Sequence, residues 1–525
     1  MRTRGVRRLP AALTAAAIVA AVCVACLAVS GQGSSIDQAT PAGRRPHIEP
    51  NYVDAVIPPN IAPLNFRVRE QGDRYRVRVV SDRQQPIDLT SRSSTTSIPE
   101  NQWRQWLLTH RGGQLQFEVF VRNESGWKRF NAFQVTVANE EIDSHLVYRR
   151  IHPAHSLWRD MGIYQRDLRT FKESAVLTND YTKGGCVNCH TFCNNRTDTM
   201  LVSSRADTCA LIVQDGRVEK VGAKFGYASW HPNGKMVVYT DMLVSLFLHP
   251  AAEEVRDVID LDSLLEYYDT QSKRVGTAPD LAKKDRLETY PTWSPDGRWL
   301  YFCSAPLTWT SRNTIPERYD RIQYDLMRIP YDPNRGTWGQ AETVVAAKDA
   351  GRSVLLPRIS PDGRWLLVSM CDYGCFPAYS KSSDLYVIDL DAAKGTGRYE
   401  TRRLAINSDQ SESWHSWSSN SRWIAFSSKR DNGLFTRTYL SYVDTNGVVH
   451  KPFVLPQEDP TQYDSCLWTY SVPELVVEPV RTTKESLGRV VRGSRRISVQ
   501  MPVTMATPKA DTTPATGIPY QAGRE

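Results

Sequence analysis

The sequence predicts a mainly β protein, in which a small antiparallel β-sandwich precedes a β-propeller. Two observations carry this prediction. Short segments before residue 148 alternate apolar and polar residues, and a unit of turn plus strand repeats after residue 199. A chain of 525 residues is long enough for both domains.

The predicted sandwich spans residues 51–148. Residues 74–80 (RYRVRVV), 115–121 (LQFEVFV) and 133–137 (FQVTV) place an apolar side chain at every second position. This period is typical of strands with one buried face, and the glycines at 112–113 and the sequence NESG at 123–126 supply turns between them. Strands at such short spacing favour an antiparallel sandwich.

The repeated unit predicts the propeller. Each copy has a Pro-Asp-Gly-like turn followed by an alternating strand, and the copies begin at residues 229 (SWHPNGKMVVYT), 292 (TWSPDGRWLYFCS), 358 (RISPDGRWLLVSM) and 416 (SWSSNSRWIAFSS). Glycine permits a positive φ and Asp or Asn caps the turn, so each unit predicts a hairpin. A second strand pattern follows each copy, for example DLYVIDL at 384–390.

These stretches resemble the SPDG blades of TolB-type, WD40-like β-propellers. The resemblance covers residues 199–475 and implies a propeller, for which we expect six blades, with seven as the alternative. A propeller motif says almost nothing about function. The Asp296 and Asp362 carboxylates fit the role of turn caps and not of catalytic acids.

The two ends of the chain differ from its body. Four arginines in the first eight residues precede an apolar run at 10–29, which is the order of an export signal. We expect residues 1–30 to be a signal peptide or a membrane anchor, 31–50 a linker, and the body extracytoplasmic, in the periplasm or cell envelope. Residues 476–525 are basic and then rich in Thr, Pro and Ala, and predict a disordered tail.

The net charge of +8 comes from these ends. The body between them is close to neutral, which argues against a nucleic-acid-binding surface.

The segment 149–198 predicts a short irregular or partly helical region that ends in GGCVNCHTFC at 184–193. Cys-x-x-Cys-His is the attachment sequence of c-type haem, because two thiols three positions apart can bond one edge of the porphyrin while the next residue ligates the iron. Cys186 and Cys189 would form the thioethers, and His190 would be the proximal ligand of one covalent haem c. The chain resembles c-type cytochromes at this motif only.

Other interpretations of the motif stay open. A disulfide or redox pair would not need His190, and a zinc site would need a second pair of ligands, for which Cys193 and Cys209 are available. For the sixth iron position, Met200 is a candidate, with a packed strand residue as the plainer alternative. His152, His155 and His415 are further candidates, and an open position would permit chemistry on a small molecule.

The preferred hypothesis is an exported monohaem c-type cytochrome fused to a propeller. It would pass single electrons to or from a redox partner docked on the propeller, with the iron at a domain junction. One alternative is a haem-dependent oxidoreductase with an open sixth position, similar in outline to hydrazine synthase. The other is a haem-free cell-envelope propeller that binds a partner. Outside the predicted export signal and the motif, six of the ten cysteines remain, an even number that favours disulfides in an exported chain, with Cys193–Cys209 and Cys371–Cys375 closest in sequence.

Overall fold

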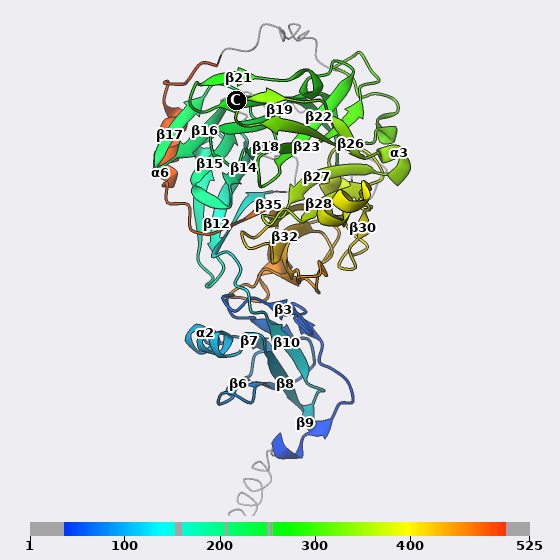
Figure 1. The fold of residues 1–525 in the computed structure, drawn as a ribbon. Helices are drawn as coiled ribbons and strands as arrows, with labels where there is room; N and C mark the ends of the chain where they lie inside the picture. Colours follow the sequence, from blue (N-terminus) through cyan, green and yellow to red (C-terminus); the bar gives the residue numbers. More distant parts are fainter. Residues whose placement is uncertain (1–35, 153–159, 205–207, 249–253, 255, 500–525) are drawn as a thin grey trace, which may run out of the picture.

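A computed structural model describes residues 36–152, 160–204, 208–248, 254 and 256–499. These residues form a mainly β fold with an N-terminal domain attached to a larger ring of sheets (Figure 1). Among them, no helix is long and apolar enough to cross a membrane. The predicted signal at 1–30, the apolar run at 10–29 and the end of the tail at 500–525 lie outside the described residues.

The N-terminal domain pairs two sheets. The strands of the larger sheet are β1 (Thr40–Pro41), β3 (Val56–Ile57), β5 (Arg74–Val80), β6 (Ile87–Ser91), β8 (Gln114–Asn123), β9 (Gly126–Arg129) and β10 (Phe133–Val137). Those of the smaller sheet are β2 (Ile48–Glu49), β4 (Phe66–Val68) and β7 (Thr95–Thr96). Rings of Phe66, Phe117 and Phe133 meet between the sheets, so the alternating residues form the core as predicted.

This domain differs from the prediction in three ways. It contains helix α2 (Glu100–Thr109), whose Trp103 and Trp106 are buried. Strand β1 runs parallel to β9 and β3 runs parallel to β10, so the larger sheet is not wholly antiparallel. Both β1 and β2 lie in the predicted linker at 31–50, because a few backbone pairs order that segment against the sheets.

Six further sheets form the ring, and the strands of each sheet are given in order from the innermost outward. Sheet I contains β35 (Thr469–Val476), β11 (His145–Ile151), β12 (Gly162–Asp167) and β13 (Glu173–Thr178). Sheet II contains β14 (Val187–Cys193), β15 (Arg196–Ser204), β16 (Cys209–Gln214) and β17 (Arg217–Val221). Sheet III contains β18 (Ala228–Trp230), β19 (Met236–Leu248), β20 (Arg256–Asp269) and β21 (Arg274–Gly276).

The other three sheets carry the remaining repeats. Sheet IV contains β22 (Arg286–Trp293), β23 (Trp299–Pro306), β24 (Asp325–Asp332), β25 (Thr337–Trp338) and β26 (Glu342–Val345). Sheet V contains β27 (Ser353–Ile359), β28 (Trp365–Cys371), β29 (Asp384–Asp389) and β30 (Arg402–Arg403). Sheet VI contains β31 (Glu412–Trp417), β32 (Trp423–Ser428), β33 (Arg437–Tyr442) and β34 (Phe453–Val454).

The innermost strands contact one another in the order β35, β14, β18, β22, β27, β31 and again β35. The six sheets are therefore the six expected blades, and β35 closes the ring by pairing with β11, which lies more than 300 residues earlier in the chain. The Pro-Asp-Gly turns join the first and second strands, with Gly297 at φ 69° and Asp296 accepting from the backbone N–H of Arg298 at 3.1 Å.

Two domain boundaries need correction. The segment 149–198 is not irregular or helical, since it forms most of blade I and the first strand of blade II, with only the short 3₁₀ turn η2 (Asn179–Thr182). The ring thus begins at residue 145 and not at 199. The tail also differs, because residues 484–492 form α6 (Lys484–Arg492), which buries Leu487 and Val491 against blades I and II.

The other helices are short connections: α3 (Ala347–Ala350), α4 (Leu390–Thr396), α5 (Gln462–Ser465), and the 3₁₀ turns η1 (Ile36–Gln38), η3 (Pro279–Leu281), η4 (Tyr319–Arg321) and η5 (Pro377–Tyr379).

One hydrophobic core continues from the N-terminal domain into blade VI, where Trp423, Leu440 and Phe453 join it. The two domains are therefore packed together and not merely tethered.

Candidate functional site

The Cys-x-x-Cys-His motif lies at the centre of the ring. Cys186 directly precedes β14, and Cys189 and His190 belong to that strand, the innermost of blade II. A tight turn precedes the motif. Lys183 and Gly184 both have positive φ, and the Gly184 N–H donates to the carbonyl of Asn179 at 3.0 Å. Both cysteines and the histidine are buried. The motif is thus part of a blade. This differs from the expectation that the propeller begins at residue 199, after the motif.

His190 is a neutral imidazole in an unusual setting. Its side chain is 2% exposed. Burial, and then the positive charge of Arg149, lower the pKa of His190 to about 3. Carbonyl groups of Val147 and Val472 approach the ring, but neither ring nitrogen completes a hydrogen bond with any described residue. A buried polar group without a partner is rare and calls for an explanation, such as a bound metal or water.

A small cavity adjoins the motif. It measures about 30 Å³, and all six innermost strands or the turns beside them contribute to its wall. The residues that line it are Cys189, His190, Tyr227, Ala228, Tyr290, Pro291, Leu356, Pro357, Arg358, Trp414 and Val472. The cavity therefore lies on the axis of the propeller, where Arg358 pairs with Glu474 at 3.0 Å.

The other candidate ligands take separate places. Met200 is fully buried in β15 and packs with Phe192 and Val202 in the core between blades I and II. This setting supports the plainer interpretation of Met200 as a packed strand residue. His152 lies with its ring centroid 6.0 Å from that of Trp468. His155 lies outside the described residues.

His415 lies on β31, the innermost strand of blade VI, and is 3% exposed. Its Nε2 pairs with the carbonyl oxygen of Leu367 at 3.1 Å, while Nδ1 has no partner among the described residues. Burial, and then the charge of Arg358, lower the pKa of His415 to about 3. His415 is thus a second neutral histidine near the axis.

Two of the groups proposed for the motif, haem c and zinc, differ in how well the described residues fit them. Its donors fit haem c, because it offers two thiols and an imidazole whose nitrogens are not engaged elsewhere. The space is small, since about 30 Å³ is room for a water molecule and not for a porphyrin. The described part of the chain holds no group of three or more His, Cys, Asp or Glu residues placed to bind a metal ion, which leaves a zinc cluster without support.

The predicted disulfides do not form in this structure. Cys193, Cys371 and Cys375 are free thiols. The Cys193 Sγ lies 3.6 Å from the carbonyl oxygen of His231. Burial raises the pKa of Cys193 to about 11, so its thiol is protonated and unreactive at neutral pH.

Several residues on the axis were missed by sequence reasoning. Tyr290, Leu356, Trp414 and Val472 line the cavity and have φ angles of 53°, 52°, 45° and 51°. Bulky residues seldom adopt a positive φ, so no local sequence pattern predicts this conformation. The one available signal was the repeat, which places Tyr290, Leu356 and Trp414 at similar points of blades IV, V and VI. Val472 lies in blade I, outside the repeats, and has no such signal.

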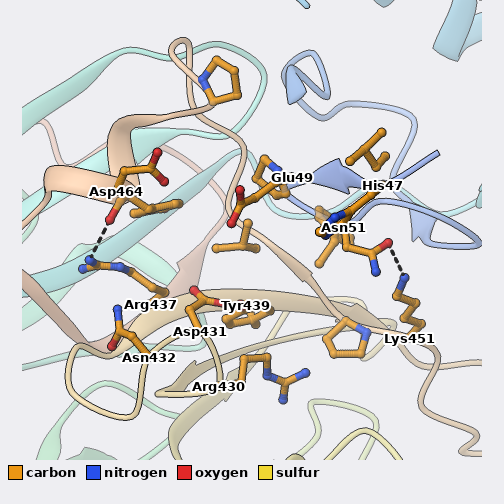
Figure 2. A pocket seen from close by; sticks show the side chains of 17 residues that line it. His47, Glu49, Asn51, Arg430, Asp431, Asn432, Arg437, Tyr439, Lys451 and Asp464 are labelled. Carbon is orange, nitrogen blue, oxygen red and sulfur yellow. Dashed lines mark hydrogen bonds between the residues drawn. The ribbon is translucent and has the colours of Figure 1, made fainter. Parts of the chain in front are cut away.

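A second cleft opens between the N-terminal domain and blade VI, with a volume of about 520 Å³ (Figure 2). Lys451 Nζ donates to Asn51 Oδ1 at 3.1 Å across it, as the figure shows. Arg67 pairs with Glu49 and with Asp464, each at 2.8 Å. These contacts connect the N-terminal domain to the propeller. The cleft is lined by both acidic and basic side chains, which favours no one class of ligand.

Comparisons with known proteins add little to this geometry. No family model matches the chain, and no curated protein matches it. Kuenenia stuttgartiensis hydrazine synthase is similar in structure with a TM-score of 0.31 and 15% identity over 50% of this chain and 64% of that one. The chain therefore spans less than two thirds of that protein.

Two other solved structures are similar at the same level. They are Vibrio parahaemolyticus oligogalacturonate lyase (TM-score 0.30, 12% identity, 55% of this chain and 84% of that one) and a putative 6-phosphogluconolactonase from Bacteroides uniformis (0.32, 12%, 67% and 94%). Likenesses this distant do not bear on activity, so function must be argued from the site.

Proposed function

We propose that this protein is an extracytoplasmic haem-c β-propeller, in which Cys186 and Cys189 hold the haem and His190 ligates its iron. The observation that carries the proposal is the imidazole of His190, which is buried in the same short segment as the buried Cys186 and Cys189, with neither nitrogen hydrogen-bonded to a described residue. Its low pKa keeps it neutral, and the neutral ring is the form that binds a metal. When bound, haem iron supplies reversible one-electron chemistry.

The role we assign is electron transfer and not catalysis. The described cavity beside His190 has room for about one water molecule, which is too little for most substrates. Electrons would pass to or from a partner protein that docks on the propeller, whose rigid strands position the surface loops. The alternative, an oxidoreductase with an exchangeable sixth position, requires a substrate space next to His190, where the described cavity measures only about 30 Å³.

The small cavity gives the proposal a clear consequence. A porphyrin can enter beside β14 only if side chains that now line the cavity move aside. Trp414 is one of those side chains, so its fluorescence should change when haem is attached.

The test is an absorption spectrum of the full chain produced together with a c-type maturation system. We expect a reduced α-band and covalent haem that survives denaturation, both lost in Cys186→Ala/Cys189→Ala. Cys193→Ala is the matched control, because this buried cysteine lies on the same strand but outside the motif, and it should keep the haem. A colourless wild-type protein would overturn the proposal. Rapid binding of carbon monoxide to the reduced iron would overturn the carrier role alone.

A further inference from the structure

The axial cavity combines two polar groups that have no partner with a wall that is otherwise largely apolar. His190 and Trp414, which is 6% exposed, both line it, and the buried polar atoms of these two residues are the ring nitrogens and the indole Nε1–H. None of these three atoms makes a hydrogen bond with a described residue. Leu356, Val472 and other apolar side chains fill much of the rest of the wall. Two unsatisfied polar residues that border one small space point to an occupant.

The size and charge of the cavity limit what that occupant can be. A volume of about 30 Å³ exceeds the 10–15 Å³ or so that a water molecule needs, and excludes larger molecules. The indole N–H can only donate, so the occupant must accept a hydrogen bond. Arg358 lines the cavity with its charge already paired to Glu474, which leaves no free charge there to hold an anion.

The backbone around the cavity is held in an unfavourable conformation. Tyr290, Leu356, Trp414 and Val472 occupy the left-handed region, each near a register shift in a ladder of the innermost strand. Such outliers persist where the surroundings fix them, and they gather at ligand sites. Each one lies on the innermost strand of its blade and lines the cavity, so four blades shape one space. Tyr290 is also tied by its hydroxyl, which donates to the Cys375 carbonyl at 2.7 Å.

From these observations we propose that the axial cavity binds one ordered water molecule, which accepts a hydrogen bond from Trp414 Nε1–H and is hydrogen-bonded to a ring nitrogen of His190. Trp414 is then a positioning residue for His190. The water can accept from both N–H groups through its two lone pairs, which would keep the ring proton of His190 on the nitrogen that faces the cavity. The water site belongs to the protein without haem, because a porphyrin on His190 would displace the side chains that form the cavity, so it is tested on haem-free protein.

A high-resolution crystal structure of the full-length protein without haem tests the site directly. We expect one water within about 2.7–3.2 Å of both Trp414 Nε1 and a His190 ring nitrogen. An empty cavity, or protein carbonyls bonded to both groups, would overturn the inference. This result is obtained without haem, so it stands whether or not the chain binds haem c.

The positioning role is tested by ¹⁵N NMR of the two histidine ring nitrogens in Trp414→Phe. We expect the His190 signals to shift from one tautomer toward a mixture, and the dipolar cross-peak between indole Hε1 and bound water to disappear. Trp293→Phe is the matched control, because Trp293 Nε1 is also buried without a described partner but lies outside the axial cavity. Unchanged His190 signals in folded Trp414→Phe would refute the role. If that variant does not fold, the wild-type cross-peak decides the question.

Discussion

The burial of His415 on the propeller axis predicts a loss of stability in acid. Its pKa falls from an ordinary value of about 6.5 to about 3, because burial and then the charge of Arg358 oppose protonation. In the unfolded chain the ring takes up a proton as the pH falls below 6.5, whereas the folded protein keeps it neutral down to about pH 3. Stability from this group is therefore complete above pH 6.5 and declines as the pH falls toward 3.

The size of the effect follows from the two pKa values. At pH 4 the unfolded histidine lies 2.5 pH units below its pKa, which costs the folded state about 3 kcal/mol relative to neutral pH. His415→Gln removes the titration and keeps a polar side chain. Between pH 7.5 and pH 4 the wild type should thus lose about 3 kcal/mol more unfolding free energy than the variant.

Urea unfolding followed by tryptophan fluorescence at both pH values gives the comparison. The other titrating groups are the same in the two proteins, so the difference isolates His415. His47→Gln is the control, because it makes the same replacement at an exposed histidine. Equal losses in the wild type and His415→Gln would refute this account of the axis.

Two further predictions concern other buried features. Burial raises the pKa of Glu288 to about 8, so this group destabilises the fold as the pH rises from about 4.5 to 8. In the same urea assay, Glu288→Gln should gain roughly 3 kcal/mol of unfolding free energy at pH 7 and little at pH 4.5. Equal gains at the two pH values would contradict the prediction. A Cβ on Gly488 of α6 would lie 1.9 Å from the Tyr181 ring, so Gly488→Ala should cost about 1–3 kcal/mol and lower Tm. Gly395→Ala, in α4 with no atom within 4 Å, should not lower Tm, and equal Tm changes in the two variants would show that α6 does not pack as described.

The sequence predicted the blades whose turns carry a chemical signature. Gly297 and Asp296 form the turn that their residue types imply, and the strands on either side follow. Blades I and II lack that signature. Strand β14 is an innermost strand buried on both faces, so apolar and polar residues do not alternate along it. Its sequence therefore shows the haem-attachment motif but no strand pattern. The closure by β35 is a pairing across most of the chain, which no local pattern encodes.

The candidate site was predicted in its residues and not in its position. The spacing of Cys186, Cys189 and His190 identified them, and the structure places them together in and beside one buried strand. Their position near the propeller axis, and the presence of Trp414 and Arg358 in the wall of the same cavity, depend on how six blades converge. Such convergence is a property of the whole ring, and a single blade's sequence does not contain it.

The central claim, that the motif on β14 holds haem, is tested most directly by the peptide that contains it. Trypsin should cut after Lys183 and Arg196, releasing residues 184–196 with Cys186, Cys189 and His190 together. From protein made with a c-type maturation system, mass spectrometry should find this peptide heavier by one haem and absorbing visible light. Recovery of the same peptide without haem, with Cys186 and Cys189 both open to alkylation, would contradict the account.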